Sequence, residues 1–106
     1  MEKTLTFKDN GKEYKLAFTR ESVIDTENAG FNINDVMDKP ITSIIYLWRG
    51  AFLAHHPTLT IAEIDTLFEH IEKNGLMDAL LDLYRAPVES LFDEEHSKNA
   101  IKWTVN

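Results

Sequence analysis

The chain contains no cysteine among its 106 residues, and this absence removes two classes of site. Disulfide bonds and thiolate metal ligands are both excluded. Glycine and proline are also scarce, at four and three residues. The few glycines do not form the glycine-rich loop that binds phosphates in nucleotide-binding proteins. The composition is compatible with a reducing compartment and gives no sign of a nucleotide cofactor.

Long hydrophobic runs are absent as well. The longest apolar stretch, residues 41–56, is shorter than the roughly 20 residues of a membrane-spanning helix, and it contains Arg49. The first residues are polar and alternating, unlike the basic and then apolar pattern of a secretory signal. We therefore expect a cytoplasmic protein without membrane association.

Positive charge is the third scarcity, with 11 basic against 18 acidic residues and a net charge of −7. Between Thr60 and Glu95, ten acidic residues are opposed only by Lys73 and Arg85, so this region carries 2 − 10 = −8. Binding to nucleic acid through its phosphates requires a basic surface, so we expect no nucleic-acid partner. The acidic half is either a solvated face that maintains solubility or a surface that meets a basic partner.

The first eighteen residues predict a β-hairpin. Apolar and polar residues alternate on both sides of Asn10-Gly11, a pair typical of a two-residue type I′ turn. This turn places Phe7 opposite Tyr14. Because an isolated hairpin is only marginally stable, its apolar face must cover helices.

Helical periodicity accounts for most of the remaining chain. Thr60 and Glu63 form a capping-box pattern at one helix start, and Pro87 is expected to break or kink the last helix. Four helices are predicted, at about residues 19–29, 40–56, 60–74 and 76–93. The predicted fold is therefore α+β in a single domain, residues 1–106. Residues 1–18 form a β-hairpin packed on a mostly helical part, residues 19–93, and residues 94–106 form a C-terminal tail.

The predicted helix at residues 41–56 is apolar on nearly every side. Ile44, Trp48 and Phe52 share one face, whereas Tyr46 and Leu53 lie away from it. A helix of this kind is either the centre of the fold or carries a second face for a partner. The sequence leaves both interpretations open.

Three residues of this chain have two interpretations each. Arg49, inside the apolar helix, either pairs with an acidic residue of the third or fourth helix or anchors a partner at an exposed face. Gly50 indicates close backbone approach by the hairpin or by another chain. Trp103 either docks on its own core or belongs to a short strand, residues 101–105, that pairs with a sheet edge.

Catalytic and metal-binding patterns are missing. The adjacent His55 and His56 point about 100° apart on a helix and lack the His-Glu-x-x-His spacing of zinc sites. No serine lies in a nucleophile-elbow motif, and the paired carboxylates follow helix faces like solvated charges. We expect no enzyme activity, no cofactor and no metal.

Several segments together resemble a known group of proteins. These are the N-terminal KTLTFKDNGKEYKLAFTRESV, the Gly30-Phe31-Asn32 connector, the run LWRGAFLAHHP at residues 47–57, and the late Lys102-Trp103-Thr104. The chain is similar along nearly its whole length to small tail assembly chaperones of siphophages and prophages of Gram-positive bacteria. The most specific part of the resemblance is the run at residues 47–57.

The resemblance implies a non-enzymatic protein of the bacterial host cytoplasm that is absent from the mature virion. Such chaperones coat the tape-measure protein, help to recruit tail-tube subunits and self-associate. From the residues themselves, we expect a partner-binding surface at Tyr46, Arg49, Phe52, Leu53 and Trp103. The alternative function is an acidic decoy or inhibitor that binds a basic surface of a host or phage enzyme.

Overall fold

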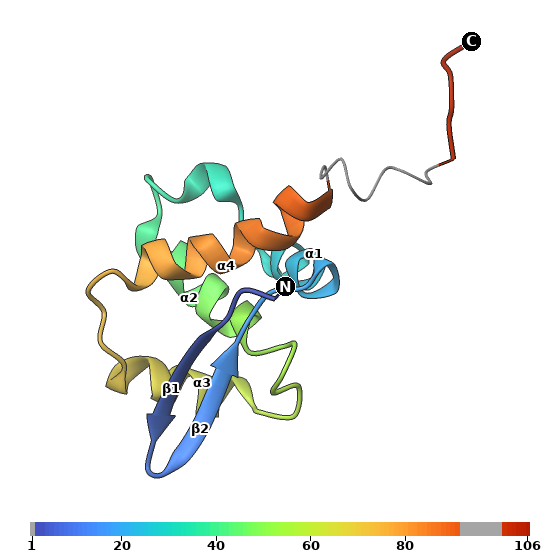
Figure 1. Ribbon diagram of the computed structural model, residues 1–106. Coiled ribbons are helices and arrows are strands. Elements are labelled where there is room, and N and C mark those ends of the chain that lie inside the picture. Colours follow the sequence, from blue (N-terminus) through green and yellow to red (C-terminus); the bar gives the residue numbers. More distant parts are fainter. Residues whose placement is uncertain (1, 92–100) are drawn as a thin grey trace.

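A computed structural model describes residues 2–91 and 101–106, and it confirms the α+β class with an N-terminal two-stranded hairpin followed by four α-helices (Figure 1). The elements in chain order are β1 (Leu5–Asp9), β2 (Lys12–Leu16), α1 (Arg20–Ala29), a 3₁₀ turn η1 (Ile33–Asp35), α2 (Pro40–Ala51), α3 (Ile61–His70) and α4 (Leu76–Leu91). The expected end of the last helix near residue 93 and the start of the predicted tail at residue 94 lie outside the described residues.

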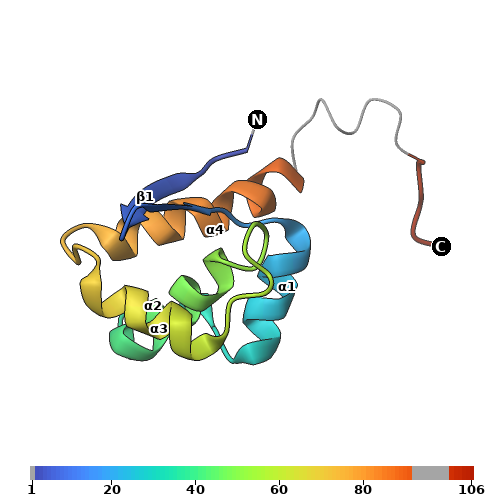
Figure 2. The same ribbon diagram turned by 90° about the horizontal axis from the view of Figure 1, so that it is seen from below.

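The hairpin has the predicted turn and register. Asn10 and Gly11 both adopt positive φ, 52° and 77°, as a type I′ turn requires. Phe7 lies opposite Tyr14 in the antiparallel pair, and their rings stack with centroids 5.1 Å apart. In Figures 1 and 2 the hairpin forms one layer and the helices form the other.

Side-chain caps begin α1 and α3, and the cap at Thr60 was predicted. The Thr19 hydroxyl accepts a hydrogen bond from the Ser22 backbone N–H at 3.1 Å, which caps α1. At α3, the Thr60 hydroxyl accepts from the Glu63 N–H, and the Glu63 carboxylate accepts from the Thr60 N–H, each at 3.1 Å. These bonds satisfy backbone donors that a helix start otherwise leaves free.

Helix α2 is the centre of the fold, in agreement with the first interpretation of its all-round apolarity. It packs against α1, α3 and α4, and its side chains Leu47 and Trp48 are completely buried. The Trp48 indole N–H donates to the backbone carbonyl of Ile64 at 2.8 Å, which ties α3 to α2. The partners that surround α2 explain why few of its residues are polar.

Two predicted helix ends are wrong. Helix α2 ends at Ala51 and residues 52–55 form turns, so it stops before His56; α3 ends at His70 rather than at residue 74. Helix α4 continues through Pro87 to Leu91, so of the expected break or kink at Pro87 the break does not occur. A proline removes its own N–H from the helical ladder and crowds the carbonyl four residues before it, but the residues after it can still bond to the preceding turn. Apolar residues that follow Pro87 line the side of α4 that faces α1.

Candidate functional site

An apolar groove of about 390 Å³ lies between α1, α2 and the beginning of α3 with the segment before it. Three of the predicted contact residues line it, namely Tyr46, Arg49 and Leu53. The other lining residues are Asp25, Thr26, Ala29, Gly50, Leu59, Ile61 and Ile64. The groove volume is at the small end of the range for ligand pockets, about 300–1,000 Å³. It therefore suits a few apolar side chains of a partner.

The floor of the groove depends on Gly50. A Cβ atom at this position would lie 2.0 Å from the Thr26 hydroxyl oxygen and 3.0 Å from a ring carbon of Phe18. The Thr26 hydroxyl is itself fixed, because it donates to the backbone carbonyl of Ser22 at 2.7 Å. The close approach predicted at Gly50 is therefore real, but the approaching element is α1 of the same chain rather than the hairpin or another chain.

Arg49 and Asp65 form a bidentate ion pair at the rim of the groove. The Arg49 Nε and a terminal guanidinium nitrogen donate to the two carboxylate oxygens of Asp65 at 3.0 and 2.7 Å. The hydrogen bond to Asp65 raises the pKa of Arg49, and the same bond lowers the pKa of Asp65. The predicted pairing of Arg49 with an acidic residue of the third helix is confirmed. Both side chains remain partly exposed.

The walls of the groove carry exposed apolar groups. The Tyr46 side chain packs over Gly30, with its Cζ and hydroxyl oxygen each 3.4 Å from the position of a Cβ there. The Arg49 guanidinium lies 6.0 Å from the centroid of the Tyr46 ring. Leu53 is exposed, and Ile61 is 59% exposed. Sequence reasoning missed Ile61 as a site residue, because its helical spacing with Ile64 and Leu67 predicts a buried position.

The structure places Phe52 in the core, so its prediction as a contact residue is wrong. Its side chain has no exposed surface, and its ring meets Trp48 edge to face with centroids 5.0 Å apart. The turn after Ala51 directs Phe52 toward the hairpin, where Phe7 and Tyr14 also contact it edge to face. Leu53, the next residue, is directed to the groove instead.

Trp103 lies apart from the groove. Its side chain is 80% exposed, and Ile101 and Val105 are also exposed. The interpretation that Trp103 docks on its own core is therefore wrong for the described structure. Residues 101–106 form no strand there, and the role of Trp103 as a second contact stays a prediction.

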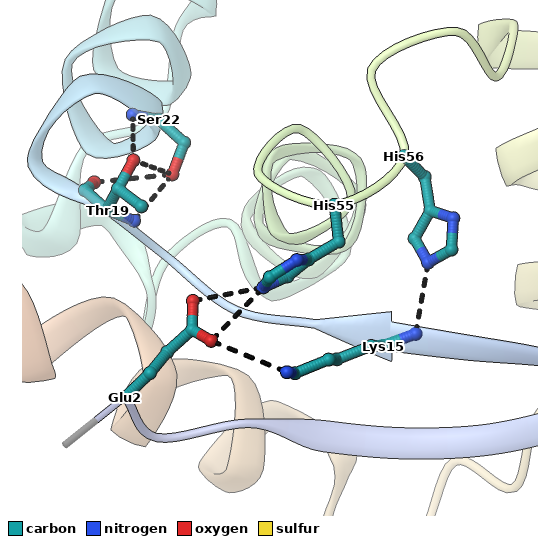
Figure 3. Close-up of polar contacts among 6 residues, drawn as sticks. All are labelled: Glu2, Lys15, Thr19, Ser22, His55 and His56. Carbon is teal, nitrogen blue, oxygen red and sulfur yellow. Dashed lines mark hydrogen bonds and ion pairs between the residues drawn. The ribbon is translucent and has the colours of Figure 1, made fainter.

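The two adjacent histidines take part in separate structural contacts (Figure 3). His55 Nε2 lies 3.0 and 3.2 Å from the carboxylate oxygens of Glu2, and the same carboxylate lies 3.8 Å from the Lys15 ammonium. His56 Nε2 accepts a hydrogen bond from the backbone N–H of Lys15 at 3.0 Å. Over residues 2–91 and 101–106, no three His, Asp or Glu side chains are grouped so that they could hold a metal ion.

The contact of His56 with β2 predicts a dependence of stability on pH. Burial lowers the pKa of His56 below its ordinary value of 6.5. The unfolded chain therefore binds a proton at higher pH than the folded chain. The stability that the neutral ring contributes is complete above pH 6.5 and is lost as the pH falls below this value and through the lower pKa of the folded chain. We expect His56→Gln, which keeps an acceptor but does not titrate, to lose less stability than the original chain under acidification.

Urea unfolding at pH values about one unit above and below the ordinary histidine pKa measures this difference. The difference between the two chains matters, because other groups also titrate in this range. An equal loss of unfolding free energy in both chains would contradict the assigned role of His56.

The chain belongs to a protein family described as a domain of unknown function (DUF5055), which matches residues 1–106. No curated protein and no solved structure matches the chain. Within the part of the chain that the structure describes, no helix combines the length and apolar character needed to cross a membrane. Membership of this family shows that the chain is related to it over the whole sequence, and it implies no activity.

Proposed function

We propose that this member of the DUF5055 family is a non-enzymatic tail assembly chaperone of a phage or prophage. In this proposal the protein binds and solubilises the tape-measure protein and helps to recruit tail-tube subunits. It acts in the cytoplasm of the bacterial host and is absent from the mature virion. The sequence resemblance, most specific at residues 47–57, implies this function. The groove provides a surface on which a client could bind.

The observation that carries the proposal is the apolar groove beside α2. Leu53 and Ile61 expose apolar side chains on its walls, where they would contribute to binding through their removal from water. A groove between helices commonly binds the apolar face of a partner helix. A tape-measure protein, as a long and apolar helical client, has such side chains.

The charges around the groove favour an apolar client over a strongly charged one. Arg49 is already neutralised by Asp65, so it offers little net attraction to an acidic partner. The Arg49→Glu substitution is a poor test of binding, because the new carboxylate would face Asp65 and disturb the rim. Leu53 and Ile61 are better positions, since both side chains already reach solvent.

The test is affinity capture with the tagged chain from cells in which the source phage or prophage replicates, with mass spectrometry to identify the bound proteins. We expect a tape-measure protein, with or without the tail-tube protein. The Leu53→Glu and Ile61→Glu substitutions should each weaken its binding at least about tenfold, the effect expected when one apolar contact is replaced by a charge.

The matched control is Ile41→Glu. Ile41 is 74% exposed at the start of α2 and does not line the groove. This variant carries the same added charge and should bind the client as the original chain does. Unchanged circular dichroism in all three variants separates lost binding from lost folding.

Other outcomes would contradict the proposal. Equal binding by all three variants would remove the groove as the contact surface. Recovery of a basic host or phage enzyme without tail proteins would instead favour the acidic decoy. Binding of a decoy weakens steeply with salt, whereas apolar binding changes little with salt and has a negative heat-capacity change.

A further inference from the structure

The two strands of the hairpin differ in how completely their outer edges are bonded. On β2 the Lys15 N–H donates to His56 Nε2 at 3.0 Å, and just beyond the strand the Ala17 N–H donates to the carbonyl of Ala51 at 3.1 Å. Within the described residues the sheet has only two strands. No backbone or side-chain group there bonds to the outer edge of β1. The more open edge of the sheet is therefore the edge of β1.

The register identifies which groups of β1 are open. Thr6 pairs with Lys15 across the hairpin, and the Lys15 N–H points outward to His56. In an antiparallel ladder, the backbone N–H and C=O groups of two paired residues either point toward each other's strand or both point away from it. The two kinds of pair alternate along the strands. The N–H and C=O groups of Thr6 and Lys8 therefore point away from β2, ready for another strand.

The face of β1 toward the helices is also incompletely covered. Tyr14 and Leu16 of β2 are buried, whereas their partners Phe7 and Leu5 on β1 are only half-buried. Beside β1 there is a shallow hollow whose lining includes Phe7, Leu67 and Ile71. A third strand would cover these side chains with its own apolar residues.

The same chain carries a segment with the pattern of such a strand. Residues 101–105, Ile-Lys-Trp-Thr-Val, alternate apolar and polar side chains, and all three apolar side chains are exposed. The segment has five residues, the same number as β1. In Figure 1 it lies away from the folded body, at the red end of the chain. It can therefore meet a second molecule without unfolding its own.

We infer that residues 101–105 of one molecule add to the outer edge of β1 in a second copy of this chain. The backbone of Thr6 and Lys8 would bond to the incoming strand, and Trp103 would lie beside Phe7. In a symmetric pair each copy donates one segment and accepts one. This self-association does not depend on the identity of any client.

Sedimentation equilibrium of the full chain tests the inference. We expect a reversible dimer that Trp103→Glu weakens about 30-fold or more, the effect of losing one strong interface residue. Thr6→Pro should weaken it as well, because it removes an outward N–H while leaving the ladder to β2 intact. The matched control Ile41→Glu adds a charge at an exposed apolar site away from β1 and should leave the dimer unchanged.

A mixture of the two weakened variants gives the sharpest result. The Thr6→Pro chain keeps its donor segment and lacks a good edge, whereas the Trp103→Glu chain keeps its edge and lacks a good donor. One intact contact remains between unlike chains, whereas neither homodimer keeps one, so when each defect abolishes its contact we expect the mixture to form a heterodimer more readily than either variant forms a homodimer. A failure of folding in Thr6→Pro would remove this gain and is detected by circular dichroism.

Three results would overturn the inference. The first is a monomer at all concentrations with unprotected Thr6 and Lys8 amides in hydrogen exchange. The second is a monomer in which those amides are protected, since the segment would then pair with its own β1. The third is a dimer that neither Trp103→Glu nor Thr6→Pro weakens.

Discussion

Replacement of Phe52 by alanine is expected to lower the free energy of unfolding by about 3–5 kcal/mol, the usual cost of removing a large aromatic ring from a core. The ring has no exposed surface and meets Trp48, Phe7 and Tyr14 edge to face. Its loss leaves a cavity between the hairpin and α2 that these rings can fill only in part. Urea unfolding followed by circular dichroism measures the change.

The adjacent residue provides the control. Leu53 reaches solvent, so Leu53→Ala removes less buried surface and should cost clearly less stability than Phe52→Ala. The order should be reversed for client binding. Measured on the folded fraction of each protein, Leu53→Ala should weaken binding more than Phe52→Ala does. A Phe52→Ala chain as stable as Leu53→Ala would contradict the placement of Phe52 in the core.

Replacement of Gly50 by alanine should destabilise the protein by about 1–3 kcal/mol, the cost of overpacking a tight site. On an exposed helix the same substitution stabilises by about 1 kcal/mol, because alanine is the better helix former. Here the new methyl group would lie 2.0 Å from the Thr26 hydroxyl oxygen. The sign of the effect therefore reports directly on the contact between α1 and α2, and thermal or urea unfolding measures it.

A double-mutant cycle with Thr26→Ala isolates that contact. Thr26→Ala alone removes the bond to the Ser22 carbonyl and should be destabilising. In that background, however, Gly50→Ala should cost less than it does alone, because the nearest obstructing atom is gone. Additive effects would show that the cost arises elsewhere, for example at the Phe18 ring, which a Cβ would approach to 3.0 Å.

The parts of the fold that sequence predicted well depend on residues close together in the chain. Asn10-Gly11 determined both the turn and the register of the hairpin, because the turn type needs two positive φ values that few other residue pairs adopt. Thr60 and Glu63 likewise determined a helix start through bonds within four residues. Such rules are local and need no knowledge of the tertiary structure.

The candidate site was only partly predictable, because its surface depends on contacts between distant segments. Tyr46, Leu53 and Phe52 belong to one apolar stretch, and nothing local distinguishes the buried ring from the exposed side chains. The packing of the hairpin on Phe52 makes that distinction. Arg49 shows the intermediate case, since its need for an acidic partner was predictable while the choice of Asp65 required the position of α3.

The bonds of Lys15 and Ala17 to His56 and Ala51 have a consequence for solubility at high concentration. Growth of a cross-β fibre requires two free edges on every molecule, so that each added chain offers a new template. Within the described residues His56 and the end of α2 bond to the outer side of β2, whereas the outer edge of β1 is open. Hairpins therefore cannot stack β2 edge onto β1 edge in an unbroken series, and this route to a fibre is obstructed at every molecule.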